Sequence, residues 1–131
     1  MGLGLGILLG VLWRWRVFPE AWIGHVVGWP LILFGLAVTT WAVVAAAGAD
    51  LKRPGHLVVT GPYCRSRNPM YLAWTALYIG FALVLNTVWP LLLLPVVVLL
   101  TDLTIRHEER TLEATFGDAY RAYRSRVRRY L

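Results

Sequence analysis

The sequence is poor in cysteine and in charge, and these two shortages exclude several kinds of protein. A single cysteine, Cys64, excludes an intramolecular disulfide, and no cysteine–histidine pair has the spacing of a metal-binding motif. Charged residues make up only 15% of the chain, whereas 58% are hydrophobic and the mean hydropathy is +0.59. We therefore expect no metal site. We also expect most of the chain to be surrounded by lipid.

Acidic residues are also scarce, with 7 against 13 lysines and arginines, which leaves a net charge of +6. The basic residues lie between and after apolar runs, and they do not alternate with exposed aromatics as they do in a nucleic-acid-binding face. We interpret them as cytoplasmic flanks of membrane segments and expect no nucleic-acid partner. The apolar start, MGLGLGILLGVLW, has no basic residue before it and no cleavage motif, so we expect it to be retained.

Four apolar segments account for most of the chain, and a membrane-spanning helix needs roughly 20 such residues. They are residues 3–13, which form a marginal span, and residues 21–49, 69–85 and 88–105. The last two are separated only by Asn86 and Thr87. So short a link predicts an antiparallel helical hairpin.

The basic residues lie mostly on one side of this arrangement. Four are in the loop 50–68 and seven follow the fourth segment, so the positive-inside rule places the loop and the tail in the cytoplasm. In the tail, apolar and aromatic residues recur at helical spacing, which predicts an amphipathic helix along the membrane interface. They are Leu112, Phe116, Tyr120, Tyr123, Val127 and Tyr130.

We therefore predict a single all-α integral membrane domain over residues 1–131, with about four transmembrane helices, a C-terminal helical hairpin and an amphipathic interfacial tail helix. Its parts are N-terminal helices over 1–49, a cytoplasmic loop over 50–68, the hairpin over 69–105 and the tail over 106–131.

Two polar groups meet at the cytoplasmic end of the predicted hairpin. Arg67 and Asn68 precede Pro69 at the start of the third segment, and Glu108 and Glu109 follow the fourth. Carboxylates at a membrane boundary are costly unless they are paired or bind a cation. One interpretation is a set of ion pairs, namely Asp102 with Arg106, Glu109 with Arg67 or Arg110, and Glu113 with Arg110.

The other interpretation is a binding pocket. A carboxylate for an ammonium, an arginine for a carboxylate and an apolar wall for a flat base match the three groups of S-adenosylmethionine. Two stretches then make the sequence recognisable: HLVVTGPYCRSRNPMYLAW and EERTLEATFGDAYRAYRSRVRRY. Together they resemble the isoprenylcysteine carboxyl methyltransferase and phospholipid methyltransferase family of integral-membrane enzymes. The resemblance covers about residues 52–131. This chain departs from the family pattern at Asn68, where the family usually has a histidine that can titrate.

The resemblance implies S-adenosylmethionine-dependent methyl transfer to a lipophilic or lipidated acceptor at the cytoplasmic membrane face, like that of the isoprenylcysteine carboxyl methyltransferases. It implies catalytic roles for Arg67, Glu108 and Glu109. The implied S-adenosylmethionine site comprises His56, Leu57, Val58, Gly61, Tyr63, Arg67, Asn68, Tyr71, Glu108 and Glu109.

Three alternatives stay open at this point. One is an N-methyltransferase acting on a phospholipid amine, and another is a nicotinamide-dependent sterol reductase with a similar helical plan. The third is a non-enzymatic membrane scaffold whose tail recruits anionic lipid or a partner. Membrane lipids are expected partners in every case, and the oligomeric state is left open.

Overall fold

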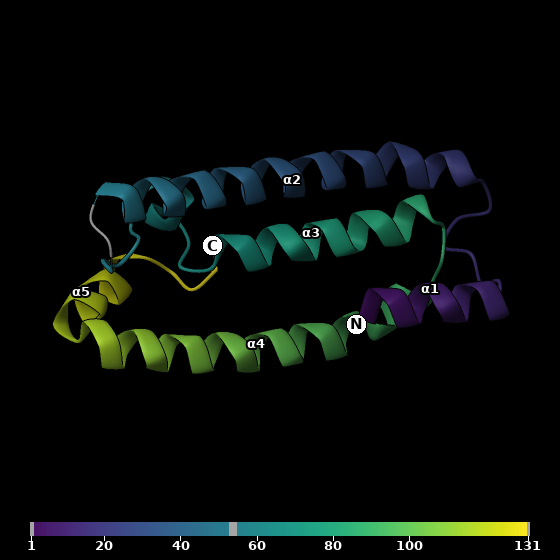
Figure 1. The fold of residues 1–131 in the computed structure, drawn as a ribbon. Helices are drawn as coiled ribbons and strands as arrows, with labels where there is room; N and C mark the ends of the chain where they lie inside the picture. Colours follow the sequence, from purple (N-terminus) through teal and green to yellow (C-terminus); the bar gives the residue numbers. More distant parts are fainter. Residues whose placement is uncertain (1, 53–54, 131) are drawn as a thin grey trace.

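The computed structural model describes residues 2–52 and 55–130, without the side chains of Leu51 and Lys52. Arg53, one of the basic residues of the predicted cytoplasmic loop, lies outside the described residues. The described part is helical and contains no named strand. Its elements are α1 (Gly2–Leu12), α2 (Ala21–Lys52), the short 3-10 helix η1 (Gly61–Cys64), α3 (Pro69–Val84), α4 (Trp89–Phe116) and α5 (Asp118–Arg126). The helices α2, α3 and α4 lie side by side and alternate in direction, which confirms the antiparallel hairpin (Figure 1).

Two helices are long and apolar enough to cross a membrane, over Ala21–Asp50 and Trp89–Phe116. The other two apolar helices, α1 and α3, have 11 and 16 residues. At a rise of 1.5 Å per residue they extend about 16 and 24 Å, less than the hydrocarbon core of about 30 Å. The four predicted transmembrane segments are therefore two long helices and two shorter ones.

Glycines let α2 and α3 approach closely. A Cβ atom added at Gly28 would lie 2.7 Å from the carbonyl oxygen of Gly80, and one added at Gly80 would lie 2.9 Å from that of Gly28. Small residues permit this backbone contact between helices in lipid, where packing rather than water exclusion drives association. As a result, α2 and α3 form a closely packed pair of helices.

The hairpin turn also holds the connection between α1 and α2. Asn86 has a positive φ of 49°. Its Oδ1 accepts hydrogen bonds from the backbone N–H groups of Val17 and Phe18, at 3.0 and 2.9 Å, and its Nδ2 donates to the carbonyl of Phe18 at 3.0 Å. A residue expected only to link two helices therefore ties the chain together at the end opposite to the loop 50–68 (Figure 1).

The tail differs from the single helix predicted over 106–131. The helix α4 continues to Phe116, and Gly117, with a φ of 51°, ends it. The nine-residue α5 then turns back toward α3 (Figure 1). The aromatic stripe of the tail faces protein instead of lipid, since Tyr120 and Tyr123 are only 1% and 6% exposed. The reason is the glycine turn, because a chain reversal at this point brings α5 against the loop that precedes α3.

After α5 the chain runs beside the start of α3. Arg128 forms an isolated parallel bridge with Ser66, and the N–H of Arg67 donates to the carbonyl of Arg128 at 2.9 Å. The last described residues are therefore built into the same end of the molecule as Arg67, Glu108 and Glu109.

Candidate active site

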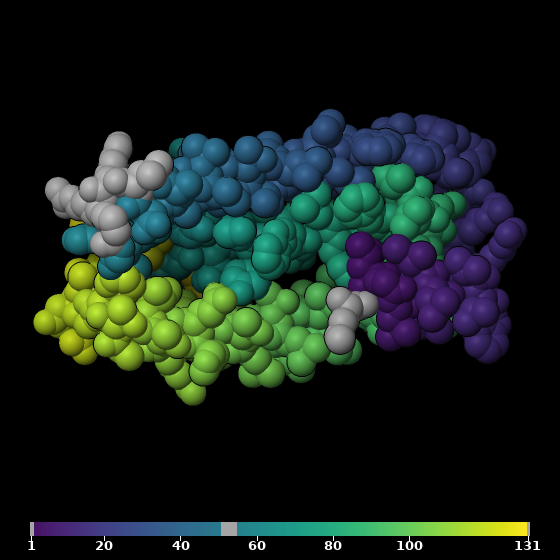
Figure 2. All heavy atoms as spheres, in the orientation of Figure 1, coloured from purple at the N-terminus to yellow at the C-terminus, as the bar shows by residue number. Residues whose placement is uncertain are grey.

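A cavity of about 460 Å³ lies where the start of α3, the last third of α4, the loop before α3 and α5 meet. Figure 2 shows a hollow between α3 and the second half of α4, whereas α2 and α3 are in contact. The lining residues are His56, Leu57, Val58, Tyr63, Arg67, Asn68, Pro69, Met70, Tyr71, Trp74, Glu108, Glu109, Leu112, Phe116, Tyr120 and Tyr123.

Every residue of the predicted S-adenosylmethionine site except Gly61 lines this cavity. Gly61 instead has a φ of 62°, and a Cβ there would lie 2.7 Å from the Cβ of Ala45 on α2. Only glycine combines this backbone conformation with so close an approach. Its role is to seat η1 against α2, which in turn positions the loop that carries Tyr63.

The centre of the site is a carboxylate shared by two arginines. Arg67 Nη1 lies 2.9 Å from Glu109 Oε1, and Arg129 contacts both oxygens of Glu109, with Nη2 at 2.8 Å from Oε2 and Nε at 3.2 Å from Oε1. The hydrogen bond to Glu109 raises the pKa of Arg129, so the guanidinium stays charged. Arg129 Nη1 also lies 3.9 Å from Asp102 Oδ1, so the two arginines are faced by two carboxylates and carry no excess positive charge.

The ion-pair interpretation is confirmed for two of its pairs. Glu109 pairs with Arg67, and Asp102 pairs with Arg106 at 2.6 Å. Glu113 was expected to pair with Arg110, but it faces α5, where it lies within 3.9 Å of Arg121 and 3.4 Å of Arg124. The chain reversal at Gly117 creates these pairs, and sequence spacing alone does not anticipate them.

Arg67 retains an unused donor. Its Nη1 also donates to the hydroxyl of Tyr120 at 3.3 Å, yet its Nε is buried and has no hydrogen-bond partner among the described residues. The side chain is 9% exposed. A buried charged donor without a partner costs on the order of 1–3 kcal/mol or more, so it calls for an explanation such as a ligand.

Glu108 differs from its neighbour. It is exposed, accepts a hydrogen bond from the hydroxyl of Tyr71 at 2.8 Å, and takes part in no salt bridge within the described part of the chain. Burial and, secondly, the charge of Glu108 raise the pKa of Tyr63, which therefore stays neutral. Glu108 is thus a carboxylate at the cavity wall whose charge is not balanced by an arginine.

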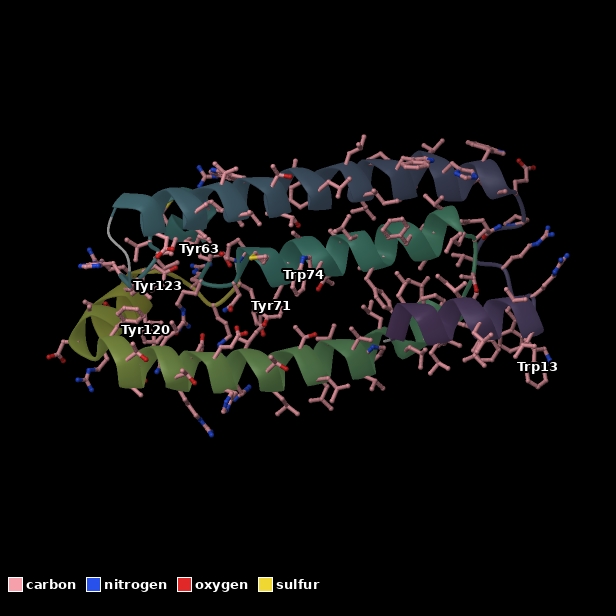
Figure 3. The ribbon with its side chains drawn as sticks, viewed as in Figure 1. Trp13, Tyr63, Tyr71, Trp74, Tyr120 and Tyr123 are labelled. Carbon is pink, nitrogen blue, oxygen red and sulfur yellow. The ribbon has the colours of Figure 1, made fainter. Side chains whose placement is uncertain are left out.

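Aromatic side chains surround these charges. Tyr71 and Trp74 pack edge to face, with ring centroids 5.5 Å apart, and the hydroxyl of Tyr123 donates to the carbonyl of Tyr63 at 2.6 Å. Figure 3 shows Tyr63, Tyr120 and Tyr123 gathered at the same end, while Trp13 lies at the opposite end of the molecule.

Asn68 holds the returning tail. Its Nδ2 donates to the carbonyl of Arg129 at 3.1 Å, and Ser66 Oγ donates to the same carbonyl at 3.3 Å. Asn68 is 8% exposed, so this amide is committed to the backbone of the tail. At the position where the resembled family has histidine, this chain uses a group that donates a hydrogen bond and does not titrate.

Several residues that line the cavity were not predicted from the sequence. Trp74 lies three residues after Tyr71, a spacing that puts both on one helix face, and this was the available signal. Tyr120 and Tyr123 belong to the recognised tail motif, but their helical spacing was attributed to a lipid-facing stripe. Phe116 was placed on that same stripe.

Comparison with known families agrees with this geometry. A family model described as phospholipid methyltransferase matches residues 23–119. The chain belongs to the phospholipid methyltransferase family. The match begins on α2, well before the motif resemblance over 52–131, and it stops just before Tyr120. No curated protein and no solved structure matched the chain in the corresponding searches.

Membership of the phospholipid methyltransferase family, together with two long apolar helices, makes this chain a membrane protein of a methyltransferase family. Within the described residues, no group of three His, Cys, Asp or Glu side chains is arranged to hold a metal ion.

Proposed function

We propose that this protein transfers a methyl group from S-adenosylmethionine to a lipophilic acceptor at the cytoplasmic face of the membrane. The observation that carries the proposal is one cavity lined by Arg67 with its buried, partnerless Nε, by Glu108, which forms no salt bridge among the described residues, and by aromatic side chains. The family of the chain supports the same reaction class.

The residues present fit S-adenosylmethionine. The partnerless Nε of Arg67 suits the carboxylate of its methionine part, and the carboxylate of Glu108 suits its ammonium. Tyr63, Leu57 and Val58 provide an apolar wall for the adenine. When bound, S-adenosylmethionine supplies a methyl group on a sulfonium, whose C–S bond breaks as the bond to the acceptor forms.

The protein's own contribution is mainly alignment. Arg67 orients an anionic group, and Glu109 keeps Arg67 in place through the 2.9 Å ion pair. Glu109 is therefore a positioning residue, whereas Glu108 and Arg67 are the groups that contact ligand. Holding two reactants in line supplies much of the rate enhancement of a displacement reaction.

We further propose a carboxylate acceptor of the isoprenylcysteine type. A carboxylate reaches the site already ionised, and Arg67, which lines the cavity and whose buried Nε has no hydrogen-bond partner among the described residues, favours an anion. A phospholipid amine is the second candidate. It is supported by the description of the matching family, and Glu108 would suit its ammonium form.

The test is calorimetry of S-adenosylmethionine and S-adenosylhomocysteine with folded protein in nanodiscs. We expect heat of binding for both ligands, and its absence would leave the non-enzymatic scaffold as the better account. Methyl transfer from radiolabelled S-adenosylmethionine to N-acetyl-S-farnesylcysteine and to phosphatidylethanolamine then separates the two acceptors.

A further inference from the structure

A second, apolar groove continues the cavity between α3 and α4. Its volume is about 320 Å³, and Tyr71 and Trp74 line both spaces, so the two adjoin. All the residues that line the groove are uncharged. From Thr104 to Leu94 it follows ten residues of α4, about 15 Å at 1.5 Å per residue, or about half of a hydrocarbon core of roughly 30 Å.

The groove exists because α3 meets its two neighbours differently. Glycines bring α2 and α3 into backbone contact, whereas α3 turns Tyr71, Trp74 and Tyr78 toward α4. These large side chains hold α4 away, and Figure 2 shows the resulting gap.

Three hydroxyl groups of the groove already donate a hydrogen bond to the backbone. Thr75 Oγ1 donates to the carbonyl of Tyr71 at 2.9 Å, and Thr104 Oγ1 donates to that of Leu100 at 3.0 Å. The hydroxyl of Tyr78 donates to the carbonyl of Pro90 at 2.9 Å. With these hydroxyl groups engaged and no charged residue in its lining, the groove offers mainly apolar surface, which suits a hydrocarbon chain.

The end of the groove remote from the charged cluster is closed by α1. A Cβ at Gly2 would lie 2.5 Å from Val97 Cγ2 and 3.4 Å from the hydroxyl of Tyr78, so this end has no spare room. The open end, at Tyr71 and Trp74, adjoins the cavity that contains Arg67 and Glu108. A molecule with a polar group and one apolar chain fits this arrangement, with its polar group in the charged cavity and its chain in the apolar groove.

We infer that the groove binds a single hydrocarbon chain of the methyl acceptor, and that the contact between α1 and Val97 sets the longest chain it accepts. This inference rests on the proposed methyl transfer. The groove has room for a single chain, because its volume of about 320 Å³ is at the lower end of the range of about 300–1,000 Å³ for small-molecule sites.

The first experiment maps the chain directly. The full protein in nanodiscs is irradiated with a farnesylcysteine analogue that carries a diazirine on its prenyl chain, and labelled residues are identified by mass spectrometry. We expect label on residues 94–104 and on Trp74. Thr101→Phe, which fills the groove, should reduce this label by about tenfold, equivalent to roughly 1.4 kcal/mol. Leu103→Phe is the matched control, since Leu103 is 55% exposed and lies outside the groove.

The second experiment tests the length limit with farnesyl and geranylgeranyl acceptors. Val97→Ala lengthens the groove and should raise turnover of the geranylgeranyl acceptor relative to the farnesyl acceptor about tenfold, equivalent to roughly 1.4 kcal/mol. Val98→Ala, an adjacent exposed position, should leave the ratio unchanged.

Binding of S-adenosylhomocysteine is measured on every variant as a check of folding, and Thr101→Leu replaces Thr101→Phe if the larger side chain prevents folding. If the unmodified protein does not bind S-adenosylhomocysteine, the proposed function fails. If it binds but the groove is not labelled, if Thr101→Phe or its replacement leaves the label unchanged, or if Val97→Ala leaves the ratio unchanged, the groove inference alone is overturned.

Discussion

Arg67 and Glu109 form a buried ion pair, with Nη1 and Oε1 2.9 Å apart and each side chain 9% exposed. Because Arg129 binds the same carboxylate, removing Glu109 would leave Arg67 without its anion and Arg129 with only Asp102, 3.9 Å away. Breaking a buried pair from one side typically costs about 3–5 kcal/mol. Substitution of Glu109 is therefore expected to lower stability, whereas substitution of the adjacent Glu108 is expected to weaken ligand binding.

Glu108→Gln should lower the affinity for S-adenosylmethionine about ten- to a hundredfold, the loss expected when one charged hydrogen bond of roughly 1.5–3 kcal/mol is removed. Its melting temperature should change little because Glu108 is exposed. Glu109→Gln should lower the melting temperature markedly. Calorimetry and thermal unfolding on the same preparations test both effects. Arg124→Ala, 51% exposed on α5, is the control. Equal affinities for Glu108→Gln and the unmodified protein would remove Glu108 from the site.

Gly28→Ala should destabilise the pair of α2 and α3 by about 1–3 kcal/mol, because the new methyl group would lie 2.7 Å from the carbonyl oxygen of Gly80. Gly48→Ala, on the same helix with no neighbouring atom within 4 Å, should stabilise by up to about 1 kcal/mol through helix propensity. Thermal unfolding in detergent measures both. Similar melting temperatures for the two variants would argue against the close helix contact.

Alkaline pH should destabilise the protein partly through Tyr123. Burial raises the pKa of this residue from 10.0 to about 12. Between these values the unfolded chain loses the phenolic proton while the folded chain retains it, so stability falls as pH rises. Tyr123→Phe should melt at a lower temperature at neutral pH, because it loses the hydrogen bond to Tyr63, worth about 1 kcal/mol. Between pH 10 and 12, the melting temperature of Tyr123→Phe should fall less steeply than that of the unmodified protein. Parallel curves would contradict the raised pKa.

The two ends of the molecule should lie on opposite sides of the membrane. In a Cys64→Ser background, cysteine at Asp118, whose side chain is 97% exposed, should react with a membrane-impermeant maleimide only from the cytoplasm. Cysteine at the exposed Arg14 should react only from the other side. This orientation is expected because basic residues are concentrated in the loop 50–68 and in the tail. Labelling of both positions from one side would refute the proposed orientation.

The sequence alone was sufficient for the helical class, the hairpin, the family and the neighbourhood of Arg67, Glu108 and Glu109. Each depends on local information. Apolar runs specify helices in lipid, a two-residue link specifies an antiparallel turn, and two motifs in order specify the family. The pairs of Asp102 with Arg106 and of Glu109 with Arg67 were also foreseen, the first from spacing and the second from the hairpin.

Only the tertiary structure decided what covers each apolar face and which carboxylate keeps its charge free. Helical periodicity identifies the stripe that contains Tyr120 and Tyr123, but it does not distinguish lipid from protein as the covering surface. The turn at Gly117 made that choice by folding α5 back. The same reversal brought Arg129 to Glu109, so that Glu108, its neighbour in sequence, remained the carboxylate without an arginine. Such a distinction depends on where distant segments meet in space, and no local pattern contains it.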